Sequence, residues 1–160
     1  MIHLGTLIVV KDIGNSKKFY CDLFGLTVMS DFGANISLSG GISLQTADSW
    51  KMFINKKDDE IVFGNNASEL YFEDDDLDSF VKKLENYGNV RYVHGVVEFP
   101  WGQRVIRFYD PDMHIIEVGE NLDIVVKRFV DWGMSLEETA ARMGVPEVYV
   151  SSALARLEGR

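Results

Sequence analysis

Residues 19–26, Phe-Tyr-Cys-Asp-Leu-Phe-Gly-Leu, are the stretch that decides the fold of this chain. They end a helix predicted over 17–24, with Asn15 or Ser16 as its cap and Gly25 at the position of a helix stop. The apolar, β-branched run 3–10 before this helix indicates a strand. Three short strands are predicted after it, at 26–31, 35–38 and 42–46. The first unit is therefore predicted to be a strand, a helix and three strands.

A second unit repeats this order after a connector at 47–67 that is rich in Lys, Asp and Asn. Residues 69–74 alternate polar and apolar side chains, as a half-buried strand does. A helix capped by Asp75 or Asp76 is predicted to reach Tyr87, because its apolar residues recur at helical spacing. Strands are predicted next at 91–99, 103–109 and 114–118. The sequence thus predicts an α+β fold of two βαβββ units.

The C-terminal part changes character and predicts three short helices, at 122–132, 136–143 and 148–157. Residues 135–150 resemble a helix-turn-helix, with Gly144 at the turn. Residues 119–160 hold five Lys and Arg against seven Asp and Glu, a net charge of −2, and Arg156 is the one basic residue of the last helix. Because phosphate contacts supply most non-specific affinity to DNA, the charge of the tail favours packing within the molecule or a protein partner over DNA.

Composition narrows the classes of function further. Hydrophobic residues make up 46% of the chain and the formal net charge is −9, a balance that repels nucleic acid. There is no apolar run of the ~18 residues that a membrane span needs, and we see no signal peptide. Cys21 is the single cysteine, so no disulfide is expected within the chain. We therefore expect a cytoplasmic protein.

Several short motifs together resemble the vicinal oxygen chelate superfamily, the fold of glyoxalases, bleomycin-resistance proteins and extradiol dioxygenases. The motifs are the stretch 19–26 with Asp12 before it, the acidic helix entry 75–78, Pro-Trp-Gly at 100–102, Asp-Pro-Asp at 110–112 and Ile-Ile-Glu at 115–117. The resemblance covers 3–119. It implies a glyoxalase/bleomycin-resistance-like domain at 1–119 whose curved mixed sheet encloses a concave cavity. Residues 120–160 are then a helical extension.

The resemblance also implies four positions for the ligands of a divalent metal such as Zn²⁺, Ni²⁺, Mn²⁺ or Fe²⁺. They fall on Gly5, Gln45, Glu69 and Glu117. Glycine offers no donor atom, so the predicted set is incomplete. His3, two residues earlier on the same predicted strand face, is a candidate replacement. In a glyoxalase-type isomerase, Glu117 or Glu69 would act as the general base.

Members without a metal hold their ligand with aromatic rings and charges in the same hollow. The candidate lining residues are Trp50, Phe53, Tyr71, Phe99, Trp101, Tyr109 and Arg107. Arg107, with Arg104, is suited to an anionic group, although alternating charges are also typical of a surface strand. The family usually has Gly where this chain has Met113, which predicts an altered turn after Asp-Pro-Asp.

These observations lead to three hypotheses of function. The first is a cytoplasmic small-molecule-binding protein of the glyoxalase/bleomycin-resistance type, homodimeric, with an incomplete metal site. The second is a metal-dependent lyase or isomerase that uses Glu69, Glu117 and Gln45, with a further ligand from His3 or a partner chain. The third is a regulator whose helical tail binds protein or DNA.

Overall fold

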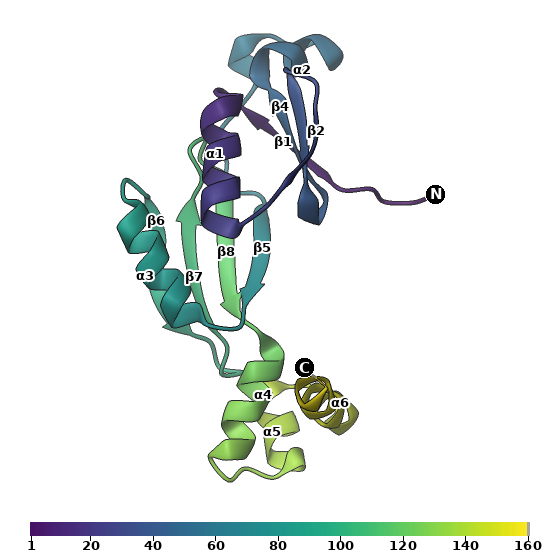
Figure 1. The fold of residues 1–160 in the computed structure, drawn as a ribbon, viewed down its shortest axis with the longest axis vertical. Coiled ribbons are helices and arrows are strands. Elements are labelled where there is room, and N and C mark those ends of the chain that lie inside the picture. Colours follow the sequence, from purple (N-terminus) through teal and green to yellow (C-terminus); the bar gives the residue numbers. More distant parts are fainter. Residues whose placement is uncertain (160) are drawn as a thin grey trace. The chain divides into compact units, whose positions relative to one another are not determined.

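The computed structural model describes residues 1–159, and these form two compact units (Figure 1). The first contains Met1–Glu69, Tyr87–Arg91 and Tyr109–Ile115; the second contains Leu70–Asn86, Tyr92–Phe108 and the chain from Ile116 onward. Each unit holds one four-stranded sheet, as the α+β prediction required. No helix among the described residues combines the length and apolar character that crossing a membrane requires.

The first sheet has the strand order β1-β4-β3-β2. Its elements are β1 (Thr6–Val10), α1 (Ile13–Phe24), β2 (Val28–Asp31), β3 (Asn35–Leu38), the 3₁₀ turn η1 (Ser39–Gly41) and β4 (Ile42–Thr46). Strand β1 runs parallel to β4, and β3 runs antiparallel to both β4 and β2. The core of this unit is made by alternate strand residues and one face of α1, namely Ile8, Val10, Ile36, Leu38, Leu44, Phe19, Tyr20 and Leu23.

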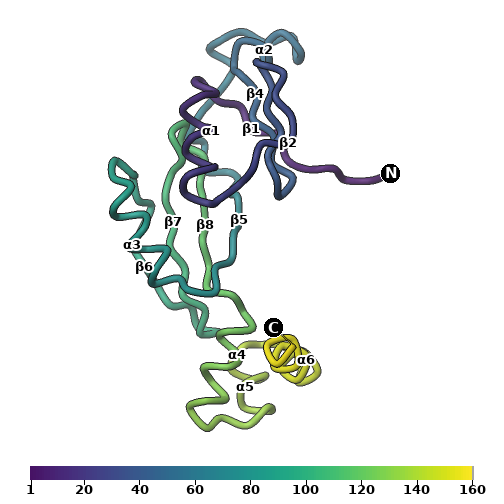
Figure 2. Tube along the Cα trace, viewed as in Figure 1, coloured from purple at the N-terminus to yellow at the C-terminus, as the bar shows by residue number. Residues whose placement is uncertain are grey.

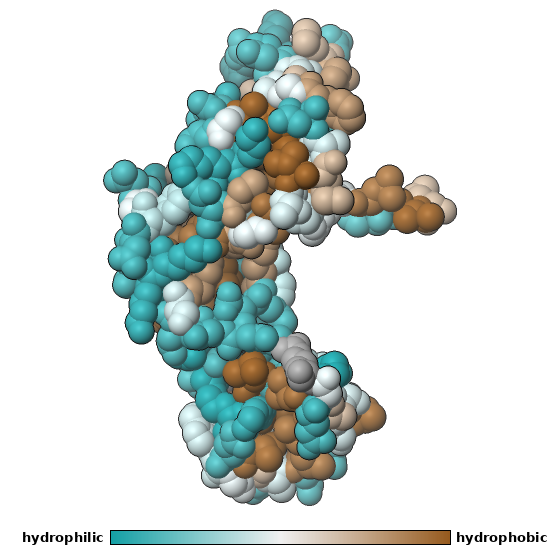
Figure 3. All heavy atoms as spheres, viewed as in Figure 1, coloured by the Kyte–Doolittle hydropathy of each residue, from teal (hydrophilic) through white to brown (hydrophobic). Residues whose placement is uncertain are grey.

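The start of β1 differs from the prediction, and Gly5 is the reason. The strand begins at Thr6, so His3 lies in an exposed arm before it and does not share a strand face with residue 5. Gly5 has a φ of +154°, and a Cβ at this position would lie 2.2 Å from the carbonyl oxygen of Gly41. Backbone therefore fills the space that a side chain would need. Figure 3 shows the apolar surface of the arm, where Ile2 and Leu4 are exposed.

Helix α1 begins earlier than predicted because Asp12, and not Asn15 or Ser16, is its cap. The Asp12 carboxylate accepts a hydrogen bond from the Asn15 backbone N–H at 2.9 Å.

A second correction concerns the predicted connector, which contains the helix α2 (Ala47–Phe53) and the 3₁₀ turn η2 (Asp58–Glu60). A helix of seven residues is too short to show a helical period, and the prediction therefore missed α2.

The second sheet has the strand order β5-β8-β7-β6 (Figure 2). Its elements are β5 (Glu69–Asp74), α3 (Leu77–Tyr87), β6 (Tyr92–Glu98), β7 (Arg104–Tyr109) and β8 (Ile115–Glu120). Buried residues of α3 and of one sheet face form its core: Leu77, Phe80, Leu84, Ile106, Phe108, Ile116 and Val118. The opposite face carries no helix of the βαβββ pattern and is called the open face below.

The turn between β7 and β8 belongs to the first unit and is held by the Asp110 carboxylate. That group accepts hydrogen bonds from the backbone N–H groups of Asp112 and His114 at 2.9 and 2.8 Å, and from the Tyr20 hydroxyl at 2.8 Å. Met113 has a φ of +71°, the left-handed conformation that glycine adopts easily. The expected change of turn geometry is therefore wrong: Met113 occupies the left-handed conformation.

The chain ends in three helices, α4 (Leu122–Asp131), α5 (Leu136–Met143) and α6 (Glu147–Glu158). They share a small core of Val125, Val126, Phe129, Ala140, Met143, Val150 and Ala153. Ser135 and Glu138 form a capping box at the start of α5, and Gly144 ends that helix in the left-handed conformation. These local signals explain why the sequence located the tail helices within one or two residues.

Candidate functional site

The alternation of exposed and half-buried side chains along β5 shows which of its residues lie on the open face. Glu69, Tyr71 and Glu73 are exposed, whereas the residues between them are half-buried. Gly119 of β8 belongs to the same face, because a Cβ there would lie 3.2 Å from the Tyr71 hydroxyl. Glu117, two residues before Gly119, shares this face by strand alternation. The predicted orientation of β5 and β8 therefore agrees with the structure.

Glu117 is buried and forms an ion pair with Arg107 of β7. The Arg107 guanidinium lies 3.4 Å from Nε2 of His94 and 5.5 Å from the centre of the Phe99 ring. The positive charge thus sits on the open face, with its partner carboxylate beneath it. A buried carboxylate is costly unless a cation accompanies it, and Arg107 supplies that cation here.

A second polar network lies beside this pair and is centred on Gln103, which is 5% exposed. Its side-chain N–H donates to the Tyr71 hydroxyl at 2.9 Å, and its oxygen accepts from the Trp101 indole N–H at 3.1 Å. The Tyr71 hydroxyl donates to Glu73 at 2.7 Å. Partial burial, with the Glu73 hydrogen bond second, raises the pKa of Tyr71 to about 12. Tyr71 is therefore a neutral hydrogen-bonding group at physiological pH.

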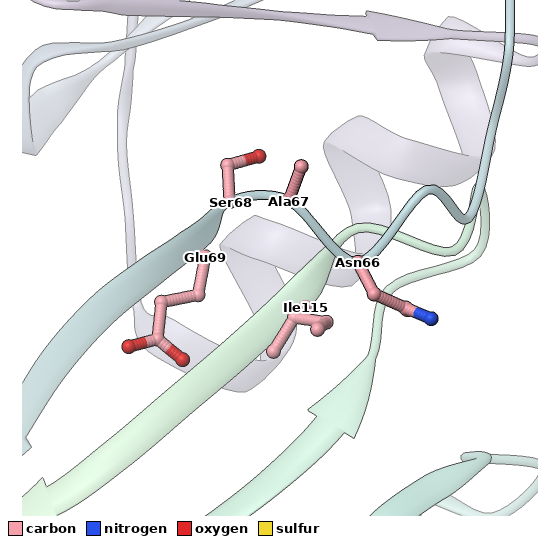
Figure 4. Close-up of a pocket in the computed structure, with 5 residues that line it drawn as sticks. All are labelled: Asn66, Ala67, Ser68, Glu69 and Ile115. Atoms are coloured by element: carbon pink, nitrogen blue, oxygen red, sulfur yellow. The ribbon is translucent and has the colours of Figure 1, made fainter.

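The first unit contributes a shallow pocket of about 280 Å³ at the start of β5. Its lining residues are Asn66, Ala67, Ser68, Glu69 and Ile115, drawn in Figure 4. The Tyr109 hydroxyl donates to the Asn66 side-chain oxygen at 2.9 Å and fixes the loop that leads into β5. The pocket is mainly polar, and Glu69 is its one carboxylate.

The predicted metal ligands do not form a suitable donor set. The Gln45 amide is buried, with its oxygen accepting from Asn35 at 2.8 Å and its nitrogen donating to the Ala34 carbonyl at 3.1 Å and to Ser49. Gly5 has no donor and no room for one, and Glu117 is paired with Arg107. Among residues 1–159, no three His, Cys, Asp or Glu side chains gather as a metal cage would need. The residues present therefore do not fit the metal that the fold family implies.

The predicted aromatic lining divides between the two units. Phe99 and Trp101 stack nearly parallel, with ring centres 4.6 Å apart, and accompany Tyr71 in the second unit. Trp50 and Phe53 lie on α2 in the first unit, not in a loop as predicted, and the Phe53 side chain is exposed. Arg104 lies on the helix-covered side, where it pairs with Asp78 and Glu120.

Two participants were missed by sequence reasoning. Gln103 was treated only as the first residue of a strand, although it connects Tyr71 with Trp101. A buried amide just before a strand carries no sequence signal of its own, because glutamine is common on surfaces. The loop residues Asn66–Ser68 were assigned to a connector, and only their spatial closeness to Ile115 reveals the pocket.

Two βαβββ units, each with a helix on one sheet face, define the vicinal oxygen chelate class of fold. A glyoxalase-like domain family matches residues 4–123, and the chain belongs to that family. The match ends at the start of α4, so α5 and α6 lie outside it. A comparison with curated proteins gave no match.

Solved structures agree with this assignment. A protein of unknown function from Agrobacterium tumefaciens str. C58 is 36% identical, with a TM-score of 0.68 over 76% of this chain and 94% of that one. A glyoxalase/bleomycin resistance protein/dioxygenase family enzyme from Burkholderia phytofirmans PsJN is 16% identical, with a TM-score of 0.65 over 73% and 96%. Lactoylglutathione lyase from Agrobacterium tumefaciens is 21% identical, with a TM-score of 0.56 over 74% and 92%. At these two lower identities the likeness concerns the fold alone.

Proposed function

We propose that this chain binds a small organic molecule on the open face of its second sheet, and that it does so without a metal ion. The observation that carries the proposal is the ion pair between Arg107 and Glu117. It places a fixed protein cation on the carboxylate that the family resemblance assigned to a metal. Tyr71, Trp101 and Phe99 add aromatic surface beside it, as small-molecule sites commonly do.

Metal binding would have to break this arrangement first. The Glu117 side chain is 8% exposed, and a metal that took it would have to break its ion pair with Arg107. Glu69, the other predicted carboxylate, is exposed, and the Gln45 amide is committed to hydrogen bonds within the first unit. These contacts support binding over metal-dependent chemistry. In this proposal Glu117 and Glu69 do not act as a general base.

The proposal is tested by screening small organic molecules against the purified chain before and after treatment with EDTA. We expect the same molecules to bind with the same affinity in both samples, measured by shifts in protein NMR spectra. Elemental analysis of the untreated protein is the companion measurement. Stoichiometric Zn²⁺, Ni²⁺ or Mn²⁺ that disappears in both Glu69→Ala and Glu117→Ala would overturn the metal-free proposal and favour the lyase or isomerase.

The assembly and the tail belong to the same proposal. We expect a cytoplasmic homodimer, supported by the exposed apolar side chains of the N-terminal arm, and light scattering after size-exclusion chromatography measures its mass. We expect no DNA binding, because Arg156 of α6 is already paired with Asp123 at 2.6 Å. Salt-dependent binding to duplex DNA at physiological ionic strength would contradict this expectation and support a regulator.

A further inference from the structure

The helical tail, formed by α4, α5 and α6, contacts the second sheet at the turn between β6 and β7. This turn is closed by the Gly102 backbone N–H, which donates to the Phe99 carbonyl at 2.8 Å. Phe129 of α4 packs directly on it, because a Cβ on Gly102 would lie 2.1 Å from the Phe129 ring. Arg128, the residue before Phe129, donates to the Gly102 carbonyl. Two consecutive residues of α4 therefore hold the turn.

Arg128 has a second contact with the sheet, at the end of β8. Its guanidinium pairs with the Glu120 carboxylate at 3.2 Å, and the Glu120 side chain is 4% exposed. The same guanidinium lies 5.7 Å from the centre of the Phe129 ring and 5.5 Å from that of the Trp132 ring. Aromatic faces and two fixed acceptors restrict a planar guanidinium more than they would a flexible ammonium group. Arg128 therefore connects α4 both to the turn and to β8.

The two sheet residues that α4 holds also fix the side chain of Gln103. Gly102 precedes Gln103 in the chain, and the Gln103 side-chain nitrogen donates to the Glu120 backbone carbonyl at 2.9 Å. The same nitrogen donates to the Tyr71 hydroxyl at 2.9 Å, and the amide oxygen accepts from the Trp101 indole N–H at 3.1 Å. Both N–H groups of the amide are thus used. A shift of the turn or of the end of β8 would therefore loosen the hold of Gln103 on the two aromatic side chains.

We propose that Arg128 is a positioning residue for the open face: it fixes Gln103, and Gln103 fixes the Trp101 indole. A binding surface is precise only when the side chains behind it are themselves held in place. Arg128 lies outside residues 4–123, the part of the chain that the domain family matches, so this control is an addition made by the helical tail. A partner that draws α4 from the turn would weaken binding at the open face, and a molecule bound there would weaken that partner's binding by the same factor. The inference rests on the proposed function and adds the regulation of its site by the tail.

The test follows the exchange of the Trp101 indole N–H with water by NMR, in the full chain and without a ligand. The hydrogen bond to Gln103 slows this exchange, and Trp101→Phe assigns the signal. Arg128→Lys keeps a positive charge for Glu120 but lacks the guanidinium fork that reaches two acceptors. We expect the indole N–H to exchange about fivefold faster in Arg128→Lys than in the wild type, measured well below both melting temperatures.

Arg156→Lys is the matched control. Arg156 of α6 pairs with the buried carboxylate of Asp123 at 2.6 Å and lies 5.6 Å from the centre of the Tyr149 ring, and both contacts are within the tail. We expect unchanged indole exchange in this variant, because the turn keeps Arg128. Trp132→Leu, at a position that is 67% exposed, removes one ring beside Arg128 and should speed the exchange about threefold.

An unchanged exchange rate in Arg128→Lys would overturn the positioning role; if that variant does not fold, an unchanged rate in Trp132→Leu decides against it. Equal acceleration in Arg128→Lys and Arg156→Lys would also overturn it, because the tail would then only stabilise the fold. These rates do not depend on the screen for small molecules. If the screen finds a molecule that binds and the rates are unchanged, only this inference fails. If the rates respond as expected and no molecule binds, the proposed function fails while the coupling of the tail to Trp101 stands.

Discussion

Replacing Gly102, in the turn between β6 and β7, by alanine should push the Phe129 ring of α4 away from that turn, and Gly133 offers a matched control. Gly102 has a φ of +87° and Gly133 a φ of +91°, so alanine meets a similar backbone cost of about 1–2 kcal/mol at both positions. Only at Gly102 would the new Cβ overlap the Phe129 ring, at 2.1 Å; at Gly133 nothing lies within 4 Å. Forcing a methyl group into packed space adds about 1–3 kcal/mol.

We therefore expect Gly133→Ala to lower the free energy of unfolding by about 1–2 kcal/mol and Gly102→Ala to lower it by about 2–5 kcal/mol. Urea unfolding followed by circular dichroism gives both values, provided that the slopes of the transitions agree. In Gly102→Ala the signal of the Phe129 ring should also change most among the aromatic signals. Equal losses in the two variants would refute the close packing of α4 on the turn.

Three further substitutions test the site and its surroundings. Gly5→His should lower the free energy of unfolding by at least about 2 kcal/mol, since its Cβ would lie 2.2 Å from the Gly41 carbonyl oxygen. The variant should also gain no metal affinity. A tight new site in a metal titration would show that the steric argument is wrong. Arg107→Met should lower the free energy of unfolding by about 3–5 kcal/mol, because it removes the cation paired with the buried Glu117. Adding Glu117→Leu should recover most of that loss in urea unfolding. A small loss of stability in Arg107→Met alone would mean that water solvates the pair. The pKa of about 12 at Tyr71, against about 10 in an unfolded chain, favours the neutral phenol in the folded state, so stability is present below pH 10 and falls between pH 10 and 12. Tyr71→Phe should make that fall shallower in unfolding measured from pH 9 to 12, and an unchanged pH profile would contradict the shift.

The order of strands and helices could be predicted because apolar spacing and glycine stops are local signals. The strands Asn35–Leu38, Ile42–Thr46 and Glu69–Asp74 and the helix Leu136–Met143 have the predicted bounds. Each is bordered by turn residues or by a strong cap. The helix Ala47–Phe53 was missed because it is too short to show a period, and the strand at the N-terminus was predicted too long because Gly5 interrupts an apolar run.

Strand alternation predicted which side chains of the candidate site share a sheet face, but not which of them are in contact. Alternation placed Tyr71 and Glu117 on one face, and the structure agrees. It could not show that Arg107 reaches Glu117, because that contact depends on which strands are neighbours in the sheet. Nor could it show that Phe129 of α4 packs on Gly102, since no local pattern indicates where a tail helix packs.

The turn that carries Asp110 has a consequence for dissecting the molecule. Although it connects two strands of the second sheet, it belongs to the first unit, where it accepts the hydrogen bond of the fully buried Tyr20 hydroxyl. A fragment that stops after residue 69 would bury this phenol with no acceptor, at a cost of about 1–3 kcal/mol. The two compact units therefore alternate along the sequence. Neither unit can be exchanged for that of a relative by a single crossover in the gene.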